Sequence, residues 1–441
     1  MECLIQNARV VEPDRVRVTD LLIQDGVITK IGRVKAPKGA RVIRGEKLLA
    51  LPGFIDIHTH GAMGFDLTSG EFDAKRGAFV ATEAAWRKGI PAVMKRYAQE
   101  GVTRALLATA AAPMERLEMA LSLAADYVES ERNGVEGTRL EGTQLEGTFL
   151  SNPKNAGAQN PKDFMVPSCA TYDRLQRAAR GTMRYVNCVP EYGKAAVDLT
   201  RHMTRQGVLV GAGHTSCVAE EADKCRKAGL RVCVHMLNGP TGNSFKPFFG
   251  GNMVEFFLTR PDLYVELICD GYHINPSYVL DVIERKGLDR VVLVTDAMFA
   301  KGAPGVTEFA FGGLYGQLAP GGEYLRVKDD PNFTLFGSVL AMPRAFSNVL
   351  SWLTSDRPGV WHGDRLAMAT DEALVGLARA ASANPAHLLG LDRKVSSRIG
   401  EGTGALVEGK CADLVLAALS GKPGAYRLKV KHTMVEGREV A

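Results

Sequence analysis

The feature that most constrains the fold is a regular alternation of short apolar strands with longer helical patterns after Gly53. The strand-like runs are "GFIDIH", "TRALLATA", "RLEGTQLEGTFL", "VLVGAGH", "RVCVHM", "YVELICDG" and "RVVLVTD". Strands that are apolar on both faces and alternate with helices are typical of a parallel sheet covered by helices. About seven or eight such units predict an α/β fold whose strands close into a (β/α)8 barrel of the TIM type.

The two chain ends break this alternation. Residues 1–52 hold short strand patterns separated by turn signals such as Asp25-Gly26, and the tail returns to strands in "GALVEGKCADLVLAAL" and "YRLKVKHTMVEGREV". We therefore predict a small β-sandwich domain built from both termini, residues 1–52 and 399–441, around a barrel domain of residues 53–398. The Gly- and Pro-rich region from about Gly302 to Pro331 indicates a long loop over the barrel mouth.

Composition and charge narrow the class of protein. The net charge of +5 on 441 residues is mild and no Lys/Arg-rich run occurs, so no nucleic-acid partner is expected. The eight cysteines form no C-x-x-C pair, which favours reduced thiols over a zinc knuckle. The sequence shows no signal-peptide pattern and no apolar run of about 18 residues, so we expect a cytoplasmic protein without a membrane partner.

Histidines recur at the predicted strand ends. His58 and His60 are two residues apart, so both imidazoles point to the same side of an extended strand and can share one metal. His214 follows "VLVGAG" and His235 ends "RVCVH", and barrel enzymes keep their active sites at such C-terminal strand ends. The alternative is a chance pair in a loop and two structural histidines. The coincidence of four histidines favours a metal site.

Two carboxylates complete this set. Asp296 ends the apolar run "RVVLVTD" and needs a partner, which a metal or metal-associated water would supply; a helix N-cap is the alternative. Glu-Gly-Thr occurs three times, led by Glu136, Glu141 and Glu146. The odd spacing places Glu141 and Glu146 on opposite faces of a strand, and only Glu146 reaches its C-terminal end. We therefore predict a metal ligand at Glu146, a structural pairing for Glu141 and a polar loop position for Glu136.

This set of residues fits metal-dependent hydrolysis. A divalent metal activates water and polarises a carbonyl. Asp296 would take the proton as general base and return it to the leaving nitrogen as general acid. His273 in "CDGYHINP" lies just past another strand end, where we expect a substrate contact, with a loop hydrogen bond as the alternative.

Nearly the whole chain resembles the amidohydrolase superfamily and, within it, the N-acetylglucosamine-6-phosphate deacetylases. The resemblance rests on "LPGFIDIHTHG", "LEGTFLSNPKNAGAQNP", "GHTSCVAEEADKCRKAG", "VHMLNG", "CDGYHINP", "LVTDAM" and "GSVLAMPRAFSNV". It implies that Glu146, His214 and His235 are metal ligands and that Asp296 is the catalytic acid/base. His58 and His60 make a second ion possible. The resemblance also implies a homodimer.

The implied cofactor is one or two divalent ions per subunit, zinc first, with iron, cobalt or manganese as alternatives. The implied substrate is a small amino sugar phosphate. Its expected contacts are Gln159, Asn238, Gly239, Lys246, His273 and Ser338.

Several of these positions depart from the family pattern. Gln159 stands where a histidine is usual, Lys246 where an arginine is usual, and Gly239-Pro240 replaces Ala-Met. Lysine is a point charge and arginine a bidentate fork, so the exchange alters phosphate binding. The leading hypothesis is hydrolysis of the acetamide of an N-acetylhexosamine 6-phosphate. The alternatives are the same chemistry on another N-acyl amine or a cyclic amide, or an inactive homologue acting as a scaffold.

Overall fold

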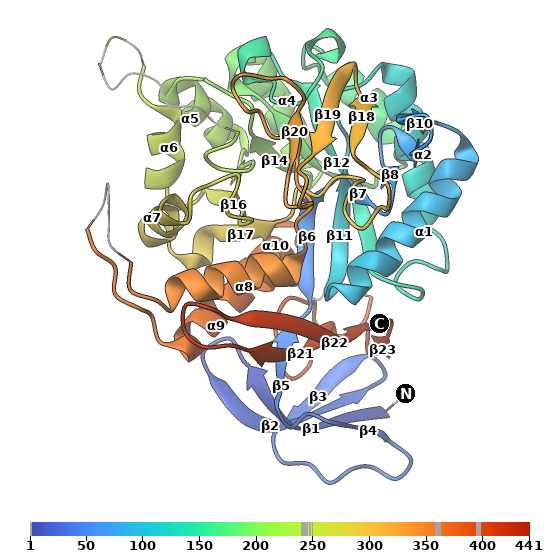
Figure 1. Ribbon diagram of the computed structural model, residues 1–441, viewed down its shortest axis with the longest axis vertical. Coiled ribbons are helices and arrows are strands. Elements are labelled where there is room, and N and C mark those ends of the chain that lie inside the picture. The colour runs from blue at the N-terminus through green and yellow to red at the C-terminus, as the bar shows by residue number, and fades with distance from the viewer. Residues whose placement is uncertain (1, 240–245, 247, 249, 358–362, 394–397) are drawn as a thin grey trace.

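The computed structural model describes residues 2–239, 246, 248, 250–357, 363–393 and 398–441. At its centre, eight parallel strands pair in the order β17-β16-β15-β14-β13-β12-β11-β6. The first and last strands come together where the Asp296 N–H donates to the carbonyl of His58 at 2.8 Å. The predicted TIM-like barrel is thereby confirmed (Figure 1). The strands are β6 Phe54–Thr59, β11 Val102–Ala108, β12 Arg139–Phe149, β13 Met183–Cys188, β14 Leu209–Ala212, β15 Val232–Cys233, β16 Tyr264–Ile268 and β17 Val291–Val294.

Helices surround the barrel and are built from recognisable end signals. In α7, Asn275 accepts from the Ser277 N–H at 2.9 Å, Pro276 occupies the first turn, and Gly287 follows the last residue with φ of +74°. In α7 these signals fix both ends of the helix, so that strand β17 can begin at Val291. The helices are α1 Glu83–Gln99, α2 Met114–Val128, α3 Cys169–Ala178, α4 Lys194–Arg205, α5 Ala219–Ala228, α6 Met253–Thr259, α7 Pro276–Lys286, α8 Met342–Leu353, α9 Thr370–Ala378 and α10 Asn384–Leu388.

The two chain ends form a small β domain below the barrel, as predicted (Figure 1). Their strands share one sheet in the order β23-β22-β21-β5-β1-β2-β3, with β4 paired to β1. This sheet has an apolar core of its own, distinct from that of the barrel. The boundaries after residues 52 and 398 stay predictions. The strands are β1 Glu2–Val11, β2 Val16–Gln24, β3 Val27–Ile31, β4 Arg41–Arg44, β5 Leu48–Pro52, β21 Leu414–Ser420, β22 Arg427–Val435 and β23 Arg438–Glu439.

A buried ion cluster joins the barrel to this domain. Arg104 on β11 donates to Asp413 at 2.6 Å and also to Glu141 on β12, and its guanidinium lies 3.5 Å from Glu436. The Arg104 side chain is only 8% exposed, so its charge depends on these carboxylates. The predicted structural pairing of Glu141 is confirmed. Glu136 instead pairs with Arg132 at the surface.

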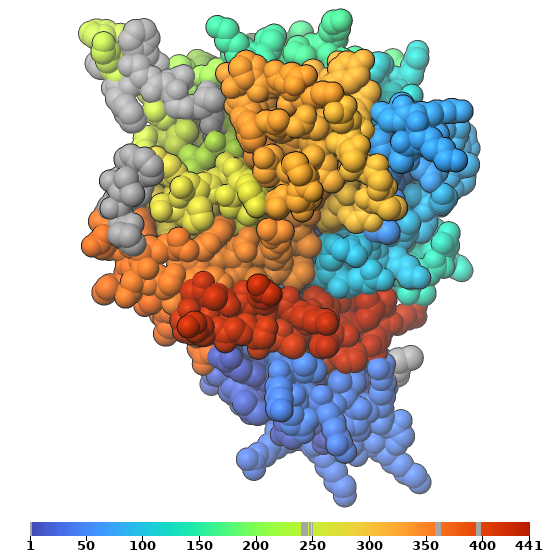
Figure 2. Space-filling model, in the orientation of Figure 1, coloured from blue at the N-terminus to red at the C-terminus, as the bar shows by residue number. Residues whose placement is uncertain are grey.

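The region over the barrel mouth is more ordered than the predicted loop. It folds into an antiparallel sheet of β18 Glu308–Phe311, β19 Leu314–Leu318 and β20 Leu325–Val327. Apolar side chains of this segment, such as Phe309 and Phe336, are buried against Phe299 and its neighbours at the barrel rim. Figure 2 shows the segment as a raised yellow-orange block on the upper part of the molecule.

A second, four-stranded antiparallel sheet follows β6: β7 Gly61–Ala62, β8 Phe65–Asp66, β9 Gly70–Asp73 and β10 Ala78–Val80.

None of the helices in the described part of the chain has the length and apolar character that a membrane crossing requires.

Candidate metal centre and active site

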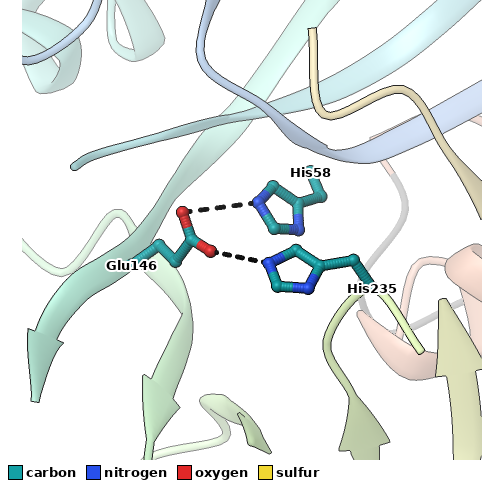
Figure 3. Close-up of side chains that lie close together, drawn as sticks. All are labelled: His58, Glu146 and His235. Atoms are coloured by element: carbon teal, nitrogen blue, oxygen red, sulfur yellow. Dashed lines mark hydrogen bonds and ion pairs between the residues drawn. The ribbon is translucent and has the colours of Figure 1, made fainter. Parts of the chain in front are cut away.

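The predicted metal ligands converge at one end of the barrel. His58 lies on β6 and His60 just past it, Glu146 lies on β12, and His235 and Asp296 follow β15 and β17. All five are at most 8% exposed. Figure 3 shows the carboxylate of Glu146 pointing toward the imidazoles of His58 and His235. The structure therefore brings these side chains together, and their role as metal ligands stays a prediction.

Backbone conformation helps to aim three of these side chains. His214, His235 and Asp296 have φ values of +54°, +30° and +50°. Non-glycine residues rarely adopt the left-handed region, and such residues cluster at functional sites. Each of the three directly follows a barrel strand or lies within two residues of its end. The strand-to-loop turns therefore direct these side chains into the barrel mouth at some conformational cost.

Glu146 is the centre of the arrangement. Its Oε1 lies 3.1 Å from His235 Nε2 and 3.3 Å from His214 Nε2. Its Oε2 lies 3.3 Å from His60 Nε2 and 3.6 Å from His58 Nε2. One carboxylate thus faces two pairs of imidazoles, one pair on each oxygen.

Asp296 lies on one side of this arrangement. Its Oδ1 is 3.2 Å from His60 Nε2 and 3.7 Å from His58 Nε2. Two groups of three side chains could each hold a metal ion, because the ligand atoms within each group all lie within 4.8 Å of one another. The groups are His58, Glu146 and His235, and His58, His60 and Asp296. His58 Nε2 is buried and has no hydrogen-bond partner among the described residues. Imidazole nitrogens and carboxylate oxygens surround this His58 nitrogen, and such a set of ligand atoms fits a divalent cation.

The charges of the site depend on one another. Burial alone would raise the pKa of Glu146, but His58, His214 and His235 hold it well below its usual range. Burial opposes the charged imidazole of His60, yet Asp296 and Glu146 raise its pKa to about 10. Metal ligation requires neutral imidazoles. Binding of a cation should therefore release protons and weaken as the pH falls.

Glu266 is a supporting residue that the sequence analysis did not identify. It lies on β16 and is fully buried. Its Oε2 is 3.0 Å from His58 Nδ1 and accepts the His235 N–H at 3.1 Å, while Oε1 accepts the Tyr185 hydroxyl at 2.9 Å. With Nδ1–H donating to Glu266, His58 keeps Nε2 available as a ligand. A glutamate inside the apolar run "YVELICDG" was the available signal.

We expect Glu266→Gln to weaken metal binding about 10-fold, because the amide can restore the hydrogen bonds but not the negative charge. Glu266→Leu removes both and should approach about 100-fold. The dissociation constant is measured by competition with a chelator. Tyr185→Phe is the matched control, since it removes one hydroxyl and leaves the carboxylate on His58. Unchanged metal affinity in both Glu266 variants would show that this carboxylate does not support the site.

The predicted substrate contacts differ in their surroundings. Gln159 donates through Nε2 to Glu146 Oε2 at 3.1 Å and accepts the Ala111 N–H at 2.7 Å, so its amide is fixed beside the metal ligand. His273 Nδ1 lies 2.6 Å from Asp270 Oδ2, which orients the ring. Gln159, Asn238 and His273 all line one cavity together with the metal ligands.

The other three contacts lie outside this cavity lining. The Ser338 hydroxyl donates to the Thr295 carbonyl at 2.6 Å, beside Asp296. A Cβ at Gly239 would lie 2.3 Å from the Val234 carbonyl oxygen, so the backbone there approaches too closely for a side chain. Lys246 is exposed and lies between residues outside the described part of the chain. The substrate contacts predicted for these three residues stay predictions.

The cavity over the metal ligands has a volume of about 560 Å³. Five of the predicted metal ligands and five phenylalanine or tyrosine residues belong to its lining. The residues are His60, Ala110, Glu146, Gly157, Ala158, Gln159, His214, His235, Asn238, Ile268, Tyr272, His273, Asp296, Met298, Phe311, Tyr324, Phe333, Thr334, Leu335, Phe336 and Gly337.

Comparisons with known proteins extend these observations. The model of the Amidohydrolase family matches residues 49–440. The chain is 27% identical over 407 residues to the N-acetylglucosamine-6-phosphate deacetylase of Bacillus subtilis, covering 90% of this chain and 88% of that protein. It is 30% identical over 311 residues to the N-acetylgalactosamine-6-phosphate deacetylase of Escherichia coli O157:H7, covering 67% and 75%. The crystal structure of N-acetyl-D-glucosamine-6-phosphate deacetylase from Mycobacterium smegmatis superposes with a TM-score of 0.78 at 23% identity, covering 100% of both chains.

Proposed function

The chain belongs to the amidohydrolase family and, within it, to the N-acetylglucosamine-6-phosphate deacetylases, and from this premise we propose that it hydrolyses the acetamide of an N-acetylhexosamine 6-phosphate. The products would be the amino sugar phosphate and acetate. The observation that carries this proposal is the convergence of four imidazoles and two carboxylates on one buried point of the barrel mouth. This set suits hydrolysis of an unactivated amide, which needs both activated water and a protonated leaving nitrogen.

The metal would be held by His58, His60, Glu146, His214, His235 and Asp296. Once bound, a divalent ion supplies a Lewis acid for the amide carbonyl and lowers the pKa of water. We propose zinc as the ion, with iron, cobalt or manganese as alternatives, and one or two ions per subunit. Each oxygen of Glu146 faces its own pair of imidazoles, an arrangement that supports two ions rather than one.

Asp296 would move the proton. Burial raises the pKa of its carboxyl, but His60 and His58 hold it below the usual range, so the carboxylate is ionised at neutral pH. It can accept the proton of the attacking water and return that proton to the sugar nitrogen as the C–N bond breaks. His273, oriented by Asp270, lines the same cavity and would contact the substrate there.

We expect Asp296→Asn to lower kcat by about 100- to 10,000-fold while KM changes little, because the amide cannot accept the proton. The measurement is acetate release by metal-loaded protein, with metal content determined on the same samples. Asp270→Asn is the comparison variant, since it weakens the orientation of His273 and should act mainly on KM. A kcat near that of the parent protein in Asp296→Asn with full metal content would exclude this proton route.

The proposal as a whole is tested with a substrate panel. Metal-loaded protein should release acetate from N-acetylglucosamine 6-phosphate or N-acetylgalactosamine 6-phosphate. Failure with every N-acetylated sugar phosphate would refute it. A second candidate is the same hydrolysis on another N-acyl amine or a cyclic amide, favoured by a cavity whose described lining residues include no lysine or arginine. Equal kcat/KM with and without the phosphate would favour that candidate.

We also propose that the protein acts in the cytoplasm as a homodimer. The motivation is its family membership together with the position of Lys246, which lies outside the lining of the subunit's own cavity. Sedimentation equilibrium of the metal-loaded protein would decide between monomer and dimer.

A further inference from the structure

Three aromatic side chains from two segments meet at the mouth of the active-site cavity. Tyr272 follows β16, whereas Tyr324 and Phe333 belong to the segment that carries β18–β20. The ring centroids of Tyr272 and Tyr324 are 5.1 Å apart, and those of Tyr324 and Phe333 are 5.8 Å apart. We call Tyr272, Tyr324 and Phe333 the aromatic wall. The residues that act on the amide in our proposal all lie elsewhere in the cavity.

Part of this wall is open to water. Tyr272 is 43% exposed and Phe333 is 48% exposed, whereas Phe311 and Phe336 of the same segment are 5% and 2% exposed. Folding buries aromatic rings where it can, so large rings left exposed along one rim of a polar-floored cavity indicate a surface that a ligand covers.

The wall is also held in place before any ligand binds. Phe309, Phe311 and Phe336 pack with Phe299 in one buried cluster that fixes the β18–β20 segment to the barrel rim. The guanidinium of Arg326 on β20 lies 4.6 Å from the centroid of the Phe333 ring, a cation–π contact. A preorganised aromatic surface binds at a low cost in conformational entropy.

The chemistry of the cavity changes from floor to mouth. The floor carries His60, Glu146 and Asp296, which suit the amide group. Among the described residues of the lining, none is a lysine or arginine, the side chains that most often bind a phosphate. The mouth offers aromatic faces and two phenolic hydroxyls. Such a surface suits an uncharged ring that has an apolar C–H face and hydroxyl groups at its edge.

We infer that the aromatic wall binds the pyranose ring of the substrate, stacking on its C–H face while Tyr272 and Tyr324 offer hydroxyls to its edge. The inference rests on the proposed function and specifies which part of the substrate the cavity recognises. It makes the wall a specificity determinant that favours a cyclic amino sugar over an open-chain N-acyl amine, independently of how the phosphate is bound.

Two ligands separate ring recognition from phosphate recognition: glucosamine 6-phosphate, and ethanolamine phosphate, which keeps the amine and phosphate but has no ring. Binding of both to metal-loaded protein is measured by calorimetry. Tyr324→Ala and Phe333→Ala should each lower the affinity for glucosamine 6-phosphate about 10-fold and leave the affinity for ethanolamine phosphate unchanged. Metal content should be unaffected, and KM for the N-acetylated sugar should change more than kcat. Tyr315→Ala, on β19 of the same sheet and 70% exposed outside the cavity, should bind both ligands as the parent protein does.

Unchanged binding of glucosamine 6-phosphate in both variants would overturn the inference, and so would an equal loss for both ligands. The outcome stays distinct from that of the proposed function. Suppose that no N-acetylated sugar phosphate released acetate, but the variants still lost affinity for glucosamine 6-phosphate selectively. The inference about the aromatic wall would then hold and the deacetylase proposal would fail. Absence of glucosamine 6-phosphate binding by the parent protein would overturn the inference itself.

Discussion

Glu146→Gln should abolish metal binding and lower the rate of acetate release by at least about 1,000-fold. The carboxylate faces His58 and His60 through one oxygen and His214 and His235 through the other. A glutamine would lose the negative charge and turn an amide NH2 toward one pair of imidazole nitrogens. Elemental analysis gives the metal content, and acetate release at saturating substrate gives kcat.

Glu136→Gln is the matched control from the same triplet pattern. Glu136 pairs with Arg132 at the surface, where the two side chains are 49% and 53% exposed. A surface ion pair of this kind contributes little to folding and nothing to the site. This variant should keep full metal content and rate. Retention of metal and rate by Glu146→Gln as well would show that the metal centre lies elsewhere.

Arg104→Ala should destabilise the folded protein by about 3–5 kcal/mol. The substitution removes a buried cation from the cluster, so that Asp413 loses its arginine and Glu141 keeps only the longer ion pair with Arg139. Asp413 lies in the terminal domain segment and Glu141 on β12, so the loss falls on the junction between the two domains. Urea denaturation followed by far-UV circular dichroism gives the change, and Arg132→Ala, an exposed arginine, should shift the midpoint far less.

The effect of Arg104→Ala should depend on pH. Burial alone would raise the pKa of Asp413, but Arg104 and its hydrogen bonds hold it below the usual range. A carboxyl with a lowered folded-state pKa contributes stability above its unfolded pKa, and this is lost as the pH falls through the folded pKa. In Arg104→Ala, burial without the arginine raises the pKa of Asp413, so the difference from the parent protein should begin to shrink above about pH 4, as the pH falls through that raised pKa. The difference should be smallest below the lowered pKa of Asp413 in the parent protein. A difference that stayed constant down to pH 3 would show that Asp413 is not the partner that matters.

Much of the site could be predicted because strand geometry is local. The alternation of side chains along a strand places His58 and His60 on one side, and it separates Glu146 from Glu141. The C-terminal ends of parallel barrel strands meet at one mouth, so residues distant in sequence could be expected together. The structure brings Asp296 within 3.2 Å of His60, and Glu146 within 3.1 Å of His235.

Other features depended on contacts between distant segments. The strand β13 Met183–Cys188 was not among the runs that the sequence analysis identified, because "MRYVNC" mixes polar and apolar residues and only its neighbours bury it. The role of Glu266 depends on its hydrogen-bond distance to His58 and Tyr185, which lie on two other strands of the barrel. The aromatic wall joins Tyr272 to Tyr324, which are far apart along the chain.

Local sequence patterns predict the alternation of strands and helices, the assembly of a small β domain from both ends, and the candidate metal ligands. These follow from periodicity and from the position of a residue relative to a strand end, which are properties of short segments. The three-dimensional fold was needed to show that Glu146 faces two pairs of imidazoles, that Glu141 binds Arg104, and that aromatic rings from two segments meet at the cavity mouth. The reason is physical: these arrangements are set by packing between elements remote in the chain, and no local pattern encodes which distant side chain completes them.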